Sequence, residues 1–423
     1  MAAYLNRLHH ISLHVSNVDK VAHELVSRFQ FNVFAARLTD RAKQLAFRRG
    51  SAVFVLNERA NEAQQRVNGH QSRVTAREHL YEAHAHYPVD TVCNVCFEVQ
   101  DVERSSRDLR DQGCEFILPP TEARDDRGLV RFSIIRSIVG NVCHTLIDRS
   151  QYQGVFLPGF HQVGTDTQTA DDSQCPITHF DHITYACPRR STPHITRWYE
   201  KNFGFQRFLI NRNEDVEEGY VLKHEGIGLR LTAMKYWKCS ESGIKLPFTD
   251  TTESDCKFVI AESLPEQGRN QVDTFLEQHR GAGIQHIGLY TEDIVSTART
   301  LTRAGVQFFS PPPAYYTEVG KLQEIVEAGH DPHTLSQYGI LLDTDVRMDT
   351  DSQITDSQRY LLQVFTKPIF AEDSFFLELI ERRGARGFGE GNIRALWRTV
   401  QAYMNEEQER IKTDHRNQQT GQN

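Results

Sequence analysis

The chain repeats one local pattern four times, and this repetition constrains the fold more than any other feature. Each copy has an apolar strand, a stretch with helical spacing of apolar residues, and a turn into an aromatic strand. The copies begin at LHHISLHVSNV (8–18), VCNVCFEVQDV (92–102), FDHITYACP (180–188) and IQHIGLYTEDI (284–294). A repeat of this kind indicates one supersecondary unit per copy. We therefore expect an α+β fold made of four βαβββ modules.

With 423 residues, the chain is too long for one ordinary core, so we expect two half-barrel domains of two modules each. The polar stretch VGTDTQTADDSQCP (163–176) suggests the boundary between them. The predicted divisions are an N-terminal domain at 1–160, a linker at 161–176, a C-terminal domain with a closing helix at 177–404, and a polar tail at 405–423.

Several shorter segments give further expectations. Prolines in FILPP (116–120) and FFSPPP (308–313) predict the end of a strand and the start of a loop. Two polar stretches, 240–255 and 343–356, are interpreted as loops between strands. The closing helix is predicted after Gly391, because apolar residues from Ile393 onward recur at helical spacing.

Composition excludes several classes of protein. A net charge of −8 offers no basic patch for nucleic acid, and no run of about 18 apolar residues predicts a transmembrane helix. The eight cysteines are scattered, and we interpret all of them as reduced thiols rather than zinc ligands or disulfides. Cys93 and Cys96 are three apart in a strand and would point to opposite faces, so they would not bind one metal together.

The duplication allows the two halves to be compared position by position. At three equivalent positions, the second half has His182, His286 and Glu378, and the first half has His10, Asn94 and Thr145. We expect the metal ligands to have been lost from the first half, so that the second half alone carries this site.

The chemistry of these three residues favours a metal. The alternation of residues in FFLELIE (375–381) predicts that Glu378 is buried. Burying a carboxylate without a partner costs on the order of several kcal/mol. The alternative, purely structural role for Glu378 is an ion pair with an arginine. For His182 and His286 it is that of hydrogen-bonded core residues. Two imidazoles and one carboxylate with open positions instead suit a non-haem Fe(II).

A family resemblance follows from longer motifs. GIQHIGLYTEDI (283–294), YLLQVFTKPIF (360–370) and FFLELIERRGARGFGEGNIRALW (375–397) resemble the 4-hydroxyphenylpyruvate dioxygenases, including their animal paralogues, in the vicinal oxygen chelate superfamily. The resemblance implies Fe(II) held by the three residues above, with a 2-oxo acid and O₂ as small-molecule partners. It also implies a substrate pocket made by Gln271, Gln363, Phe365, Phe376, Phe388 and Asn392.

Plainer roles exist for the pocket residues. Gln363 could bond to backbone within its strand, and the phenylalanines could be ordinary core residues. Asn392 could cap the helix that starts beside it. The implied roles are that Gln271 and Gln363 hold the polar ends of the substrate, and that Phe376 and Phe388 enclose its ring.

Three positions depart from the family pattern and bear on specificity. Leu231, Ala261 and Ser263 stand where the ring-hydroxylating enzymes carry serine, asparagine and proline. Each lost hydrogen bond is worth on the order of 1 kcal/mol, enough to re-aim a substrate. We therefore expect benzylic hydroxylation of 4-hydroxyphenylpyruvate to 4-hydroxymandelate. Ring hydroxylation to homogentisate and a metal-binding scaffold without turnover are the alternatives.

The cellular context rests on resemblance. It implies a mitochondrial role in supplying the ubiquinone head-group precursor, although the N-terminus shows no clear presequence, and a cytoplasmic location is the alternative. The sequence leaves the oligomeric state open, with a homo-oligomer as one option.

Overall fold

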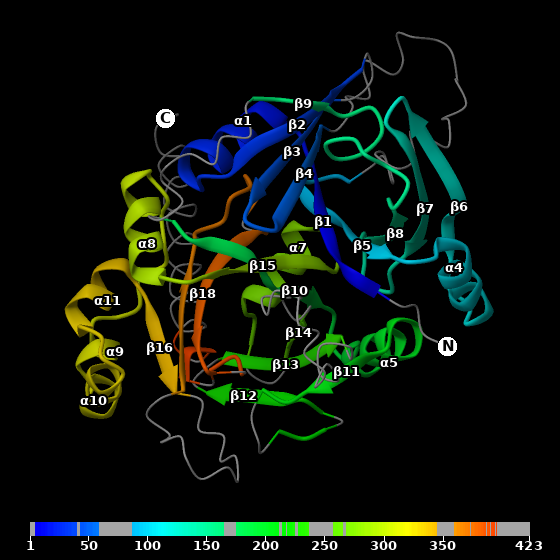
Figure 1. Ribbon diagram of the computed structural model, residues 1–423. Helices are drawn as coiled ribbons and strands as arrows, with labels where there is room; N and C mark the ends of the chain where they lie inside the picture. The colour runs from blue at the N-terminus through cyan, green and yellow to red at the C-terminus, as the bar shows by residue number, and fades with distance from the viewer. Residues whose placement is uncertain are drawn as a thin grey trace, which may run out of the picture.

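The computed structural model describes residues 5–39, 43–58, 87–164, 175–210, 214–216, 218–224, 227–236, 257–264, 268–344, 359–372, 374–385, 387–389, 391–393 and 395. Within them, the strands form two curled nine-stranded sheets, one from each half of the chain (Figure 1). The strand order is β6-β7-β8-β5-β1-β4-β3-β2-β9 in the first sheet. In the second it is β11-β13-β14-β10-β15-β18-β17-β16, with β12 paired to β13.

The strands of the first sheet are β1 (Leu5–Val15), β2 (Asn32–Leu38), β3 (Lys43–Arg49), β4 (Ala52–Glu58), β5 (Thr91–Val99), β6 (Phe116–Asp125), β7 (Gly128–Arg136), β8 (Cys143–Asp148) and β9 (His161–Gln162). Those of the second are β10 (Ile177–Cys187), β11 (Phe205–Phe208), β12 (Tyr220–His224), β13 (Ile227–Tyr236), β14 (Lys257–Ser263), β15 (Gly283–Thr291), β16 (Leu341–Thr344), β17 (Tyr360–Phe365) and β18 (Phe376–Arg383).

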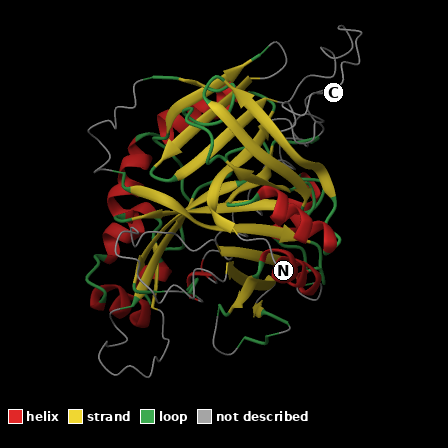
Figure 2. Ribbon diagram, turned by 45° about the vertical axis from the view of Figure 1, so that its right-hand side comes forward, coloured by secondary structure: helices red, strands yellow, loops and turns green. Residues whose placement is uncertain are grey.

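The helices lie mainly outside the sheets (Figure 2). They are α1 (Val18–His23) with the π-helical turn η1 (Glu24–Arg28), α4 (Val102–Asp111), α5 (Thr192–Phe203), α7 (Gln271–Gln278), α8 (Ile294–Arg303), α9 (Ala314–Thr317), α10 (Val319–Glu327) and α11 (Pro332–Tyr338). None of the helices in the described part of the chain combines the length and apolar character that a membrane crossing requires.

Each sheet is built from two modules joined through their first strands. β1 pairs antiparallel with β5, and β10 with β15, while the first and last strands of each module run parallel. The helix after β5 and the helix after β15 begin alike, because Asp101 and Asp293 accept hydrogen bonds from backbone N–H groups of their first turns. The predicted α+β fold of repeated βαβββ modules is confirmed.

The β3–β4 region of the first sheet contacts the start of β10 and the residues just before it. Ser51 N donates a 2.6 Å hydrogen bond to the carbonyl of Thr178, and the Arg49 guanidinium donates to the carbonyl of Cys175. The ring of Phe54 packs edge-on against Phe180 at 5.0 Å. These contacts join the halves through backbone acceptors and a shared apolar core.

The structure differs from the sequence-based expectations at several points. His161 and Gln162, expected to begin the linker, form strand β9 against β2. Pro119 and Pro120 do not end a strand but lie within β6, which is tolerated because β6 is the edge strand of its sheet and has register shifts there. The prolines at 311–313 do lie in a loop, before α9.

The fourth module holds an unexpected insertion of three helices, α9 to α11, between α8 and β16 (Figure 1). The third module has an extra strand, β12. The expected loop at 240–255, nearly all of that at 343–356, most of the closing helix and the polar tail lie outside the described residues.

The Gly50–Thr178 contact predicts a position-specific cost. Gly50 has φ +55°, and an added Cβ would lie 2.2 Å from the Thr178 carbonyl oxygen. Gly113 also has a positive φ, +90°, but its added Cβ would meet nothing within 4 Å. Gly113→Ala should cost about 1–2 kcal/mol from left-handed backbone alone. Gly50→Ala should cost clearly more, as a lower denaturation midpoint; equal midpoints for the two variants would contradict this contact.

Candidate metal centre

A β-bulge in β10 determines where the first candidate ligand points. Phe180 pairs with Leu289 and His182 with Gly288, so Asp181 is an extra residue opposite the β15 strand. Such a bulge brings two successive side chains toward one side of the sheet. Asp181 and His182 accordingly meet, with 2.9 Å between Oδ1 of Asp181 and Nδ1 of His182.

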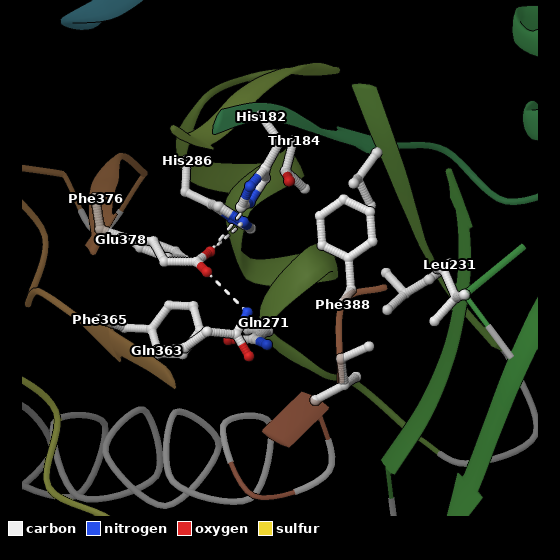
Figure 3. A pocket seen from close by; sticks show the side chains of 13 residues that line it. His182, Thr184, Leu231, Gln271, His286, Gln363, Phe365, Phe376, Glu378 and Phe388 are labelled. Carbon is white, nitrogen blue, oxygen red and sulfur yellow. Dashed lines mark hydrogen bonds and ion pairs between the residues drawn. The ribbon is translucent and has the colours of Figure 1, made fainter. Parts of the chain in front are cut away.

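Three buried side chains from three strands converge beside this bulge (Figure 3). His182 lies on β10, His286 on β15 and Glu378 on β18. The Oε2 atom of Glu378 lies 3.0 Å from Nε2 of His182 and 3.6 Å from Nε2 of His286. One ligand atom from each residue lies within 4.8 Å of the others. The carboxylate of Glu378 is therefore accounted for by imidazoles rather than by the alternative arginine ion pair.

Gly288 leaves the space that the His182 ring occupies. A Cβ on Gly288 would lie 2.4 Å from Cε1 and 2.5 Å from Nδ1 of that ring. Any larger residue would push the imidazole away from Glu378. The glycine in the fourth repeat is thus explained by close packing against a candidate ligand.

Charged neighbours polarise the site. Burial would raise the pKa of Asp181, but Arg382 and Lys257 outweigh burial and hold this pKa well below its usual range. Burial would lower the pKa of His182, yet the charge of Glu378 and the hydrogen bond to Asp181 raise it to about 9. Burial, with the neighbouring His182, lowers the pKa of His286. Without a metal, these shifts favour the imidazolium form of His182 and the neutral imidazole of His286.

This arrangement fits a divalent metal. Asp181 engages Nδ1 of His182, which leaves Nε2 directed at the centre, as carboxylate–histidine pairs do in metal sites. Arg382 holds Asp181 through two hydrogen bonds of 2.7 and 2.8 Å. Two imidazoles and one carboxylate with open positions form the donor set suited to Fe(II). Sequence reasoning missed Asp181 and Arg382, although the Asp–His dipeptide was a visible signal.

A pocket opens from the three candidate ligands. It is narrow, with a cavity volume of about 50 Å³. Its other lining residues are Thr184, Ile210, Leu231, Val259, Gln271, Gln363, Phe365, Phe376, Phe388 and Ile393. The sequence did not indicate Thr184, Ile210, Val259 or Ile393 as pocket residues, because their local patterns are the same as those of core residues.

The aromatic residues pack directly on the histidines. Phe376 stacks on His286 at 4.7 Å, and Phe388 meets His182 edge-on at 5.1 Å. Phe365 lies farther from His286, at 6.5 Å. All three phenylalanines therefore line the pocket as well as filling core space.

Gln363 and Asn392 form a chain of hydrogen bonds behind Glu378. Nε2 of Gln363 donates to Oε1 of Glu378 at 2.8 Å, and Oε1 of Gln363 accepts from Asn392 at 2.9 Å. Tyr315 donates to Oδ1 of Asn392 at 3.0 Å. The side chain of Gln363 thus bonds to a candidate ligand rather than to backbone. Asn392 is fully buried and orients Gln363, instead of lining the pocket or capping a helix.

The predicted specificity residues occupy different places. Leu231 lines the pocket, and Ala261 is its partner across β13 and β14. Ser263 does not line the pocket; it donates a 2.6 Å hydrogen bond to Asp273 in the first turn of α7. Because Gln271 begins that helix, Ser263 acts on the pocket only through the position of α7.

Comparisons with known proteins agree with this geometry. Residues 179–331 match the Glyoxalase/Bleomycin resistance protein/Dioxygenase superfamily. The chain is 39% identical to the 4-hydroxyphenylpyruvate dioxygenase-like protein of Rattus norvegicus, covering 95% of this chain and 98% of the relative. It is also 39% identical to that of Homo sapiens, covering 97% and 100%. The chain belongs to the 4-hydroxyphenylpyruvate dioxygenase-like proteins.

Other relatives are more distant. A 4-hydroxyphenylpyruvate dioxygenase of Dictyostelium discoideum is 29% identical, covering 74% of this chain and 77% of the relative. A mutant 4-hydroxymandelate synthase from Streptomyces coelicolor shares the fold with a TM-score of 0.70 at 21% identity, covering 95% of this chain and 99% of that one. The family resemblance predicted from the motifs is thus confirmed over nearly the whole chain.

Removing the carboxylate should abolish metal retention. Glu378→Ala deletes one of three donors, so Fe(II) retained after desalting should fall at least tenfold, as measured by elemental analysis. Glu381 is also a buried carboxylate of β18, but it accepts a hydrogen bond from the backbone N–H of Ile294. Glu381→Gln should keep the iron, and equal iron loss in the two variants would contradict the assignment.

Adding a side chain at position 288 should lower metal affinity by displacing the His182 ring. Gly288→Ala places a methyl group against the imidazole and should reduce Fe(II) affinity while Glu378 and His286 remain. Direct titration of the metal-free protein measures this affinity. An unchanged affinity would show that the His182 ring is not a ligand in its present orientation.

Proposed function

We propose that this protein is an Fe(II)-dependent dioxygenase that converts 4-hydroxyphenylpyruvate and O₂ into 4-hydroxymandelate and CO₂. The observation that carries the proposal is the buried trio His182, His286 and Glu378 at one end of an aromatic pocket. Bound Fe(II) would supply a Lewis acid and the redox chemistry that O₂ requires. The similarity to dioxygenases and to a 4-hydroxymandelate synthase fold supports the proposal.

The residues of the chain would bind and orient the substrate. His182, His286 and Glu378 hold the metal end, and Phe376 and Phe388 provide apolar faces beside it. Gln271 is 3% exposed, and its Oε1 has no hydrogen-bond partner within the described residues. An unpaired buried acceptor costs about 1–3 kcal/mol, so a phenolic hydroxyl that donates to it would be favoured.

The pocket wall provides the argument for benzylic attack. Leu231 and Ala261 are apolar where the resemblance implies polar contacts to the ring. With those contacts gone, the ring is held by apolar packing and by Gln271, and the side-chain carbon next to the ring becomes the favoured site. 4-Hydroxymandelate and homogentisate are isomers, because in both reactions one oxygen atom of O₂ enters the carboxylate and the other enters a new hydroxyl group. Placement alone decides between them.

Product identity tests this assignment. The iron-loaded protein with 4-hydroxyphenylpyruvate and air should give 4-hydroxymandelate, separated from homogentisate by chromatography against standards. Leu231→Ser with Ala261→Asn should shift the product toward homogentisate. Homogentisate from the unchanged protein would overturn the benzylic assignment. No oxygen uptake with any 2-oxo acid, with iron bound, would favour the scaffold alternative.

Thr184 should contribute to substrate binding. Its side chain lines the pocket beside His182 (Figure 3), it is 1% exposed, and its hydroxyl has no partner within the described residues. Thr184→Val removes the hydroxyl at nearly constant volume. The KM should rise about threefold to tenfold, the size of one net hydrogen bond, with unchanged iron content. Thr184→Ser should keep the KM near its original value; equal values for valine and threonine would refute this role.

We also propose a mitochondrial location, in the supply of the ubiquinone head-group precursor, from the family resemblance. Fractionation of cells expressing the tagged full chain tests this placement. A distribution confined to the cytosol would contradict it.

A further inference from the structure

The first sheet contains a second cluster of metal-binding side chains. His9, His10 and Cys96 are all buried, and one ligand atom of each lies within 4.8 Å of the others. The Nδ1 atoms of the two histidines are 2.7 Å apart. Neither the iron site nor the pocket uses these residues.

The cluster arises from the repeated bulge. Leu8 pairs with Phe97 and His10 with Cys96, so His9 is the extra residue in β1, as Asp181 is in β10. Two adjacent imidazoles therefore turn to one side of the sheet, where in a regular strand they would point apart. Cys96 lies directly across from His10 and completes the group.

This cluster is not a remnant of the iron site. In equivalent register, Cys96 takes the place of Gly288, the residue whose lack of a side chain admits the His182 ring. Thr145 replaces the carboxylate, and its backbone N–H and hydroxyl both bond to Asn94. The donors thus changed from two imidazoles and a carboxylate to two imidazoles and a thiol.

The softness of the donor atoms and the net charge of the occupied site indicate which metal ion this cluster would bind. Thiolate with imidazole favours Cu(I) or Zn(II) over hard cations. His9 and His10 are both buried, and the guanidinium of Arg149 lies close enough to act on them electrostatically. Phe156 stacks on His9 at 5.5 Å, which makes the surroundings apolar. One thiolate neutralises Cu(I), whereas Zn(II) would leave a net positive charge buried near Arg149.

We propose that His9, His10 and Cys96 form a three-coordinate Cu(I) site in the N-terminal half. On binding, Cys96 loses its proton to solvent, the sulfur and two imidazole nitrogens bond to the ion, and no electron is transferred. With metal–nitrogen bonds of about 2.0 Å, the two Nδ1 atoms must separate by roughly 0.8 Å. The site revises the interpretation of Cys96 as a plain core thiol and does not depend on the proposed dioxygenase activity.

The test is a Cu(I) competition titration of the full chain without oxygen, against a chromophoric Cu(I) chelator. A background with both His182→Ala and His286→Ala removes the imidazole donors of the second-half site. One Cu(I) per chain should bind, and Cys96→Ser and His9→Asp should each weaken binding at least tenfold. Cys93→Ser is the matched control, because Cys93 is a buried thiol of the same strand and lies outside the cluster; it should bind like the parent. Equal affinities for all four proteins would overturn the proposal.

The choice of His9→Asp and two further measurements keep the proposal testable if a variant fails to fold. His9→Asp introduces the residue that the second half has at this position, where it would pair with Arg149 as Asp181 pairs with Arg382. X-ray absorption of the Cu(I)-loaded parent should show one sulfur and two nitrogen neighbours, and absence of sulfur would overturn the site. Zn(II) displacing Cu(I) from the same residues would overturn the choice of metal.

Discussion

The bulged antiparallel pair of β10 and β15 is the interaction on which the candidate site depends. Pairing fixes Gly288 opposite His182, and the bulge turns Asp181 toward the same side. The parallel pairing of β15 with β18 then fixes Glu378 beside Gly288. A one-residue slip in either ladder would send a ligand to the opposite face. The apolar cores on both sides of these strands are what prevent such a slip.

Sequence patterns predicted the modules and the three candidate ligands because both follow from local periodicity and duplication. His182, His286 and Glu378 were visible as polar residues in strands that are otherwise apolar. Their second layer was harder to predict. Gln363, expected as a substrate contact, lines the pocket and also hydrogen-bonds to Glu378, and Asn392 lies behind it. Such relationships depend on which side chains reach each other across separate strands, which periodicity does not encode.

The remaining misses have similar causes. Pro119 lies inside a strand because the free edge of β6 needs no N–H donor there, and the sequence does not reveal which strand is at the edge. Ser263 was expected to act on specificity directly, but it contacts Asp273 at the start of α7. The pairing of His9 with His10 was hidden because a bulge, unlike a strand, has no sequence period.

The hydrogen-bond chain from Glu378 through Gln363 to Asn392 joins a candidate metal ligand to the segment that carries Phe388 and Ile393. Asp343 holds the same segment by accepting a hydrogen bond from the backbone N–H of Gly391. Moving this segment away from the pocket breaks the bond between Asn392 and Gln363 and frees the amide that orients Glu378. By reciprocity of coupled equilibria, a metal that prefers the oriented carboxylate must also favour the closed segment. Metal affinity and access to the pocket would then be thermodynamically coupled, because both depend on the position of the segment that carries Phe388 and Ile393.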